Sequence, residues 1–458
     1  MKLTRRSERL GYEAIFPLLV KLAIPSVVSM TVQATYNVID SIYVGHLSTD
    51  ALSALSLSFP IQLIIIALGA GTGIGTSSLI SRLLGRQKVN EANNVAQHVL
   101  FISIVYAIVI SLVGIFFTRE IVSLFTHSDV LIDLTVQYIR IIIIGSIAVF
   151  IPMLFNNILR GQGNTVAPMI GLIVGAVFNI ILDPFLIFGL WFLPDLGISG
   201  AAYATVIARA LSGIIVTAAL LSKDSQVRLN IKQFKFKFKI IKDLYAVALP
   251  AMVMQFVGSF MIAGLNRILG ELNTLALAVT GIYFRLQSFV LMPVFGFTHA
   301  YMPIMGYNYG HENPDRMKET MKTSLILAFS FTFIAFLVFQ LFPESLIKLF
   351  NDDPELVEIG VVALKRISYA YPVIGIAILG SNTFQAIGKG FPSLVISVMR
   401  QIGFLLPAAY ILSKTFGLDA TWFAFPISEG FSIVLLWIWL KKTLNKYYAQ
   451  YGEKGLLK

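Results

Sequence analysis

Long apolar segments follow one another along almost the whole of this 458-residue chain, and they restrict its fold more than any other feature. Hydrophobic residues make up 57% of the chain and charged residues 13%. A soluble domain carries about 25% charged residues, so the chain is neither an ordinary soluble protein nor a disordered one. Each segment approaches or exceeds the roughly 20 residues that cross a bilayer. Since backbone groups in lipid must be paired internally, these runs predict membrane helices.

The expected membrane helices number twelve and cover residues 14–44, 53–80, 94–117, 132–159, 166–189, 198–221, 241–267, 276–304, 319–342, 358–385, 393–413 and 419–441. The first is too long for a signal-peptide core and is expected to stay in the protein. Proline lacks a backbone N–H, so Pro25 marks the expected bend or hinge of this helix. With no cysteine and no HExxH motif, the sequence predicts no disulfide, no resident metal and no cofactor.

Lysine and arginine are distributed unequally between alternate loops. The loops on the side of the N-terminus carry 23 of these residues, and the opposite loops carry four. The positive-inside rule therefore predicts a multi-pass protein of the cell membrane with both termini in the cytoplasm. The net charge of +11 indicates loops that lie near anionic membrane lipids, and no nucleic-acid partner is expected.

The two halves of the sequence repeat at a constant offset of 225 residues. Matched pairs include Pro25 and Pro250, and Gly85 and Gly310. Because each half holds six helices, both halves have the same topology, and their pseudo-twofold axis lies along the membrane normal. The expected fold is therefore an all-α membrane protein with two six-helix lobes and a cleft between them. We divide the chain into an N-lobe (1–222), a cytoplasmic linker (223–240), a C-lobe (241–446) and a cytoplasmic tail (447–458).

The linker contains the segment KQFKFKFKIIK, from Lys232 to Lys242, in which lysines alternate with aromatic residues. The preferred interpretation is a solvated linker whose lysines enforce the topology. A lipid-sensing or regulatory segment is the alternative.

Two carboxylates lie well inside the expected helices of the N-lobe. A charge at the centre of a membrane helix costs roughly 2.5–3.5 kcal/mol, so the presence of Asp40 and Asp183 there requires a structural or functional explanation. Their repeat partners, Leu265 and Ala408, do not ionise, and Asn179 lies four residues before Asp183 on the same helix face. Acids that face a cavity of low dielectric would bind a proton, or Na⁺ together with the Asn179 oxygen. The alternative is a structural role beside nearby polar groups.

Further polar residues are candidates for the cleft. Gln33, Tyr36 and Asn37 lie within two turns of Asp40. Arg285 aligns with Pro60 in the repeat, so only the C-lobe carries this charge. The Arg285 side chain would contact an anionic group of the substrate or a carboxylate, or extend to the membrane surface. Arg209 and Glu429 are expected to pair within their own lobes. Gly71 and Gly75 have the spacing of closely packed helices.

The chain resembles the multidrug and toxic compound extrusion (MATE) family over nearly its whole length. The likeness rests on Pro25 and Asp40, the connector VGHLSTDALSALSL, the turn RGQGNT, the segment NIILDP, and GISGAAYAT. It implies a cation-coupling site formed by Asp40, Asn179, Asp183 and Thr205, with Asp40, Asn179 and Asp183 as metal ligands if the ion is Na⁺. It also makes Tyr138 a neighbour of this site, and Tyr138, Asn156 and Asn157 join the candidate cleft residues. NorM-like members carry acids in their seventh and tenth helices; this chain does not, which indicates the DinF-like branch.

The resemblance implies an antiporter that exports small amphipathic, often cationic, compounds in exchange for H⁺, or else Na⁺. A monomer surrounded by membrane lipids is expected. A flippase for lipid or polysaccharide precursors and a non-transporting receptor or scaffold are the alternatives. An enzyme is not expected, because no nucleophile–base set lies among the intramembrane residues.

Overall fold

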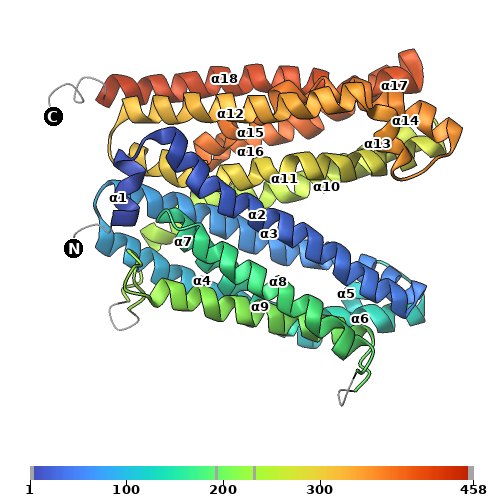
Figure 1. Cartoon of the computed structure of the whole chain (residues 1–458), viewed down its shortest axis with the longest axis horizontal. Helices are drawn as coiled ribbons and strands as arrows, with labels where there is room; N and C mark the ends of the chain where they lie inside the picture. Colours follow the sequence, from blue (N-terminus) through green and yellow to red (C-terminus); the bar gives the residue numbers. More distant parts are fainter. Residues whose placement is uncertain (1–4, 191–193, 231–233, 452–458) are drawn as a thin grey trace.

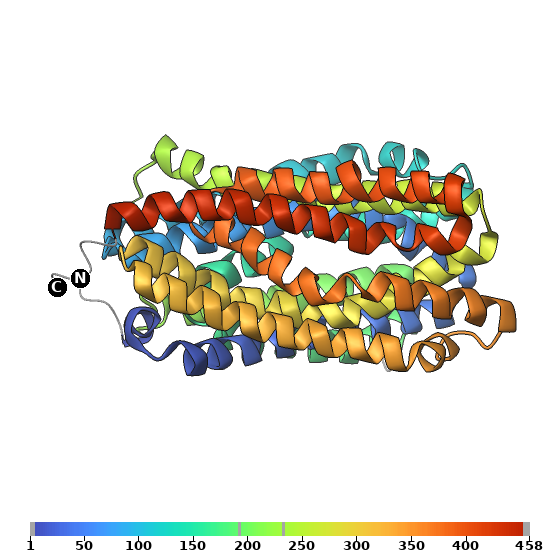
Figure 2. The same cartoon turned by 90° about the horizontal axis from the view of Figure 1, so that it is seen from above.

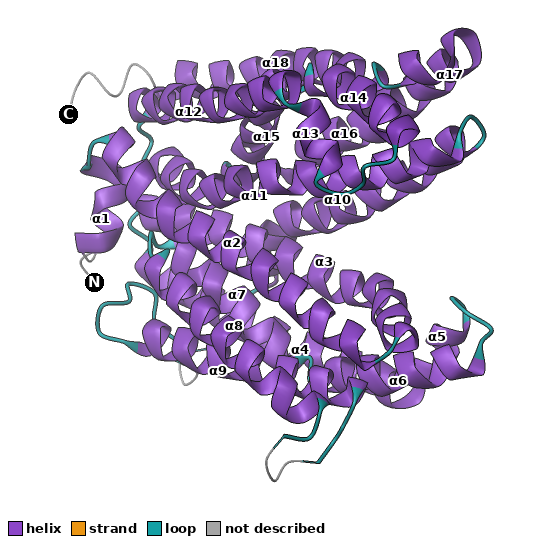
Figure 3. Cartoon of the chain, turned by 45° about the vertical axis from the view of Figure 1, so that its right-hand side comes forward, coloured by secondary structure: helices purple, strands orange, loops and turns teal. Residues whose placement is uncertain are grey.

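The computed structural model describes residues 5–190, 194–230 and 234–451, and every regular element in this part of the chain is a helix. Figure 1 shows two groups of helices that run along the long axis of the molecule, and Figure 2 shows the same arrangement from above. Colouring by secondary structure shows the two groups spreading apart away from the chain termini (Figure 3). We call the end where Arg5 and Tyr451 lie the closed end and the opposite end the open end.

Each lobe consists of long helices with shorter ones between them. The N-lobe contains α1 (Arg5–Tyr12), α2 (Ile15–Leu47), α3 (Thr49–Gly85), α4 (Val89–Phe116), α5 (Thr118–Ser123), α6 (Asp129–Ile144), α7 (Ile147–Gly161), α8 (Val166–Ile187) and α9 (Ile198–Leu221). The C-lobe contains α10 (Phe238–Gly270), α11 (Thr274–Gly310), α12 (Pro314–Leu341), α13 (Pro343–Lys348), α14 (Pro354–Ser368), α15 (Tyr371–Ala386), α16 (Gly390–Val398), a π-helix (Met399–Leu405), α17 (Leu406–Thr421) and α18 (Ala424–Tyr451).

Ten helical stretches in the described residues are long and apolar enough to cross a membrane, and two bent helix pairs bring the total to twelve if each pair is one span. The sequence predicted both pairs as continuous helices, and that detail is wrong: α6 and α7 meet at 51°, and α14 and α15 at 50°. Gly145 lies at the first break. Pro372, in the first turn of α15, lacks the N–H that would continue the second helix.

The lobes repeat each other closely. The bounds of α3, α4 and α5 shifted by 225 residues are those of α11, α12 and α13. Even unusual backbone conformations recur: Gln87 has φ 59° and Glu312 has φ 58°. These matches confirm the predicted fold class, two related helical lobes. Helix α10 begins at Phe238, before the predicted start at residue 241, and α18 extends the last helix to Tyr451.

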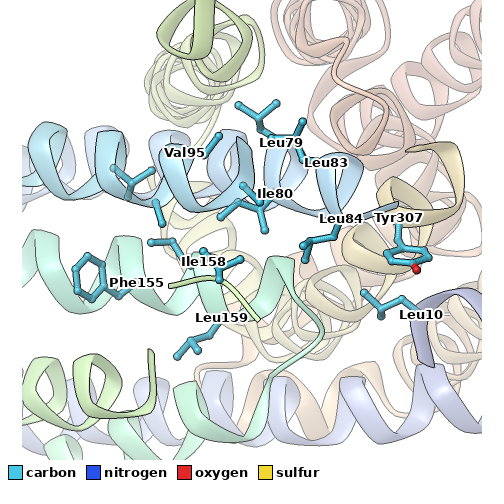
Figure 4. Packing of buried hydrophobic residues seen from close by; sticks show 14 of the residues in the cluster. Leu10, Leu79, Ile80, Leu83, Leu84, Val95, Phe155, Ile158, Leu159 and Tyr307 are labelled. Atoms are coloured by element: carbon cyan, nitrogen blue, oxygen red, sulfur yellow. The ribbon is translucent and has the colours of Figure 1, made fainter. Parts of the chain in front are cut away.

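The hydrophobic core explains why the lobes meet at only one end. At the closed end a single buried cluster crosses the lobe boundary, with Leu84 and Leu159 from the N-lobe and Leu244, Ile304 and Tyr307 from the C-lobe. Figure 4 shows part of this cluster. Toward the open end each lobe has its own cluster instead. The shared core therefore holds the lobes together at the closed end and leaves them separate at the other.

Small residues let the helices of the two lobes approach closely. A Cβ atom added to Gly71 or Gly75 would contact α10, at Met252 and at the carbonyl oxygen of Leu244 respectively. The prediction that these glycines pack helices together is confirmed. The partner helix belongs to the other lobe, so the pair forms part of the lobe interface.

Helix α1 fastens the two lobes at the closed end, which the sequence did not predict. The Ser7 hydroxyl donates to the carbonyl oxygen of Gln162 in the N-lobe. On the other side, the carbonyl oxygen of Leu10 accepts from Asn308 Nδ2 at 3.0 Å and from the Arg316 guanidinium. Leu10 itself is fully buried. Separating the lobes at this end must therefore break contacts of α1.

Candidate functional site

The two predicted acids lie together inside the N-lobe. Asp40 on α2 is 8% exposed and Asp183 on α8 is fully buried. Their carboxyl groups lie within hydrogen-bonding reach of each other. Asn179, one turn earlier on α8, donates from Nδ2 to Asp183 Oδ1 at 3.2 Å. The structure thus brings together the three residues that the sequence analysis selected.

This cluster has more buried acceptor oxygens than donors. Asp40 Oδ1, Asp183 Oδ2 and Asn179 Oδ1 are all buried and have no hydrogen-bond partner among the described residues. Two ionised carboxylates cannot donate to each other, and unpaired buried oxygens are costly. The arrangement therefore suits a proton shared between the acids, or a small cation that accepts oxygen ligands.

Arg209 on α9 lies near Asp40. Its guanidinium lies close enough to Tyr36 and to Asp40 to interact electrostatically with both. Tyr138 on α6 is 3% exposed and faces the same group of charges. With both acids ionised, one arginine leaves the cluster with a net charge of −1. A single proton or monovalent cation would neutralise it.

Local sequence explains how these helices come so close. A Cβ atom added to Gly171 on α8 would collide with Val216 on α9, and one added to Gly175 would lie tightly against the carbonyl oxygen of Ala208. The close α8–α9 contact brings the helix of Arg209 against the helix that carries the second acid. Helix α2 packs on α8 along the same region and supplies Asp40. Together with α6, which supplies Tyr138, these helices determine the geometry of the cluster.

Thr205 lies on α9, one turn before Arg209, and is 5% exposed. No hydrogen bond joins its side chain to Asp40 or Asp183 in the described part of the chain. Its role in cation binding stays a prediction. Pro25 lies inside the continuous helix α2, and its role as a hinge also stays a prediction.

A cavity of about 1280 Å³ lies between the lobes toward the open end. Its lining comes from α2, α3 and α11 and consists of Asn37, Val38, Ser41, Ile42, Gly45, His46, Leu52, Phe59, Phe284, Arg285 and Ser288. Two of the predicted cleft residues, Asn37 and Arg285, are among these. Most of this surface is apolar, and Arg285 is its one residue that is charged at any physiological pH.

The remaining predicted cleft residues lie in different surroundings. Gln33 is exposed on α2, whereas Tyr36 and Tyr138 point to the Arg209 cluster inside the N-lobe. Asn156 is half-buried. Asn157 is buried against Gly73 of α3 and donates to the carbonyl oxygen of Met153 at 2.9 Å. The two tyrosines and Asn157 thus contact other parts of the N-lobe and do not line the cavity between the lobes.

The C-lobe contains a polar cluster of a different kind. Arg400, in the π-helix, pairs with Glu429 of α18 at 3.2 Å. The predicted pairing of Glu429 within its own lobe is therefore confirmed. Late in the repeat the sequence offset becomes 220, so Glu429 occupies the position equivalent to Arg209. At this one position the arginine of the N-lobe is replaced by an acid in the C-lobe, and that acid already has a partner.

Comparison with known proteins agrees with this architecture. The family model described as MatE matches residues 25–185 and 250–411, one segment in each lobe. The multidrug export protein MepA of Staphylococcus haemolyticus is 26% identical over 93% of this chain and 93% of its own length. The FAD transporter of Shewanella oneidensis is 27% identical over 90% of this chain and 91% of its own.

A solved structure supports the same assignment. The outward-facing conformation of a multidrug resistance MATE family transporter superimposes with a TM-score of 0.91 and 26% identity, covering 98% of this chain and all of that one. These relatives are transporters and not enzymes. Together, the two repeated lobes, the family match and the structural similarity show that this chain belongs to the MATE family of membrane transporters.

Proposed function

We propose that this protein exports amphipathic compounds across the cell membrane in exchange for H⁺ or Na⁺, and that Asp40 and Asp183 couple the two movements. The observation that carries the proposal is the pair of buried carboxylates, each of which has one oxygen without a hydrogen-bond donor among the described residues. Buried charges of this kind mark ion pathways in membrane proteins. The multidrug export relative supports drug-like substrates.

The charge of the cluster explains how one ion would act as a switch. The site has two acids and one arginine, and an ion that removes the excess negative charge stabilises it. A proton would sit between Asp40 and Asp183. Sodium would take oxygens of Asp40, Asn179 and Asp183, although three protein oxygens are few for this ion. We therefore favour H⁺.

The helix that carries Asp40 links the site to the lobe interface. Helix α2 packs on α8 within its own lobe and on α11 of the other lobe. Charging or neutralising Asp40 changes the forces on α2, and through α2 the contact between the lobes. Alternating access then follows if the lobes separate at the closed end while the open end closes.

The proposal is tested with purified protein in vesicles. Efflux of a fluorescent amphipathic cation is measured first under a pH gradient alone and then under a Na⁺ gradient alone. We expect efflux under the pH gradient. Efflux under neither gradient would overturn cation coupling, and efflux under the Na⁺ gradient alone would replace the proton by Na⁺.

The proposed membrane orientation places both termini and the linker in the cytoplasm, because the positive charge is concentrated in those loops. An epitope tag inserted after Asp195, between α8 and α9, is then expected to be accessible from outside intact cells. A tag at the C-terminus is expected to be accessible only after the cells are permeabilised. The reverse pattern of labelling would overturn the orientation and, with it, the direction of transport.

The cavity favours a second substrate class, aromatic anions. Arg285 is exposed, has no ion pair or hydrogen bond among the described residues, and lies between the lobes with no carboxylate in the cavity lining. Phe59 and Phe284 line the same space. A cationic side chain beside two aromatic rings suits a flat aromatic molecule with a negative group. One relative is named FAD transporter, and FAD is an aromatic molecule with negative groups.

Replacing Arg285 tests this choice of substrate. Arg285→Ala is expected to reduce efflux of an anionic aromatic compound about tenfold, the effect of losing one charge-assisted hydrogen bond. Efflux of an aromatic cation is expected to be unchanged or faster, and Arg285→Lys is expected to recover part of the anion efflux. The control is Arg267→Ala, an exposed arginine on α10 at the same end. Equal losses for anion and cation would contradict a role in selectivity.

A further inference from the structure

In the segment that joins the lobes, Asn230 and residues 234–237 lie along one face of α4. We call residues 234–239 the strip. Asn94 Nδ2 donates to the carbonyl oxygen of Lys235 at 3.0 Å, and His98 Nε2 accepts from the backbone N–H of Lys237 at 2.9 Å. Gln97 Nε2 donates to the carbonyl oxygen of Asn230 at 2.8 Å. Polar side chains on one face of α4 therefore hold the backbone of the linker.

The state of His98 follows from these bonds. Its Nε2 accepts a backbone N–H, so the ring proton is on Nδ1, which donates to the carbonyl oxygen of Asn94 at 2.8 Å. The ring is fully buried and contacts Phe234 and Phe236, with centroids 5.0 and 5.6 Å away. His98 is thus the central contact of the strip.

The start of the linker is held just as firmly. Gln162 Oε1 accepts from the backbone N–H groups of Gln226 and Val227 at 2.8 and 2.9 Å. Its Nε2 donates to Ser225 Oγ at 3.0 Å. Gln162 belongs to the turn RGQGNT, so this motif fixes the path of the linker over the N-lobe.

The strip has two chemically different faces. Phe234 and Phe236 share one face and pack against the rings of His98 and Phe101 of α4, each with one stacked and one edge-to-face contact. Phe236 is still 57% exposed, and Phe238, at the start of α10, is 70% exposed. The lysines between and after these rings, Lys235, Lys237 and Lys239, are all exposed, and no carboxylate pairs with them among the described residues.

We infer that this strip, residues 234–239, is a binding surface for the headgroups of anionic lipids. Exposed aromatic rings beside the apolar surface of a membrane helix are suited to the interface between lipid and water. Unpaired lysines next to them attract lipid phosphate, with each lysine contributing separately. Phe101 lies three turns into the membrane-spanning helix α4, so the strip lies at the membrane boundary and not in the aqueous space.

Binding there would attach the inter-lobe linker and the first turn of α10 to the membrane. The same segment leads directly into the C-lobe, whereas its backbone is held by the N-lobe. An anionic lipid would therefore stabilise the relative position of the lobes at the closed end. This inference rests on the membrane fold alone and is independent of the proposed substrate and coupling ion.

The test uses the full-length protein in detergent, titrated with phosphatidylglycerol or phosphatidylcholine while its thermal unfolding is followed. We expect phosphatidylglycerol to raise the melting temperature more than phosphatidylcholine, and the difference to shrink at high salt. In the variant Lys235→Gln/Lys237→Gln/Lys239→Gln, the apparent affinity for phosphatidylglycerol is expected to fall at least about tenfold. These lysines are exposed, so the variant is expected to fold normally.

A matched variant removes three other charges from the same end of the molecule. In Lys88→Gln/Lys318→Gln/Lys322→Gln, two of the lysines already pair with Glu91 and Asp315. This control is expected to keep its affinity for phosphatidylglycerol. Equal losses in the two variants, or equal stabilisation of the wild type by both lipids, would overturn the inference. So would full stabilisation by glycerol phosphate alone, because a soluble anion does not use the aromatic face.

Discussion

Gradient-driven efflux is expected to fall to the rate of protein-free vesicles when either Asp40 or Asp183 is replaced by asparagine. Asparagine has the size of aspartate but neither accepts a proton at physiological pH nor supplies a negative charge to Na⁺. The cluster would then hold one acid and Arg209, with no net charge. No ion is needed to neutralise it, so ion movement and substrate movement are no longer linked.

The same substitutions are not expected to unfold the protein. A buried carboxylate costs roughly 2.5–3.5 kcal/mol at the centre of a membrane helix, and the amide costs less. The amide introduced by Asp40→Asn or Asp183→Asn would also donate a hydrogen bond to the remaining acid, which the native carboxyl group does only when protonated. We therefore expect an unchanged or higher melting temperature, and binding of substrate without net transport.

The control for this experiment is Asp133→Asn. Asp133 lies in the same lobe on α6, is exposed, and pairs with Arg119 at 2.6 Å. Exposed ion pairs contribute about 0–1 kcal/mol, so efflux and stability are expected to stay near wild-type values. Efflux is measured in vesicles for all three variants together with thermal unfolding. Wild-type rates in the double variant Asp40→Asn/Asp183→Asn would contradict coupling through this lobe.

Much of this site could be predicted because charge inside a membrane is expensive and therefore easily noticed. Asp40 and Asp183 stand out in apolar sequence, and Asn179 lies one helical turn from Asp183. Their proximity across two helices, and the contribution of Arg209, depend on how α2, α8 and α9 pack. Hydropathy does not contain that information, so Arg209 was expected only to pair somewhere within its lobe.

The fold could be predicted from the sequence for a related reason, and the predictions that failed concern single helices. Apolar length and the 225-residue repeat determine the spans and lobes. The breaks at Gly145 and Pro372 were missed because hydropathy does not register the angle between two apolar segments. The hydrogen bond between the linker and His98 joins residues that are 139 positions apart. The hydrogen bond between α1 and Asn308 joins residues that are 298 positions apart. Only tertiary structure brings these groups together.

Adding a methyl group at the closed end is expected to shift the protein away from the observed conformation. Gly85 at the end of α3 lies against the backbone of Tyr307, and Gly310 at the end of α11 lies against the backbone of Arg82. The two contacts are equivalent under the 225-residue repeat. In each, an added Cβ would overlap a carbonyl oxygen, and backbone atoms inside packed helices move little.

The expected size of the shift follows from the cost of overpacking. Inserting a methyl group into a packed contact costs about 1–3 kcal/mol, which changes the ratio of two conformations by roughly 5–150-fold. The variant Gly85→Ala should therefore populate a state in which the closed end has separated. The lobes then approach each other at the other end. Efflux is expected to slow, since one conformation of the cycle has become less accessible.

The measurement uses the absence of cysteine from the native chain. Ser123→Cys on α5 and Ser345→Cys on α13, both exposed at the open end, carry spin labels whose separation is measured by pulsed electron resonance. Gly85→Ala is expected to add a population at shorter distance. Gly281→Ala is the control, because nothing lies within 4 Å of a Cβ at that position. If Gly85→Ala and Gly281→Ala give the same distances, the glycine contact does not hold the closed end together. The lobes would then depend on the shared hydrophobic core and on α1 for their closure.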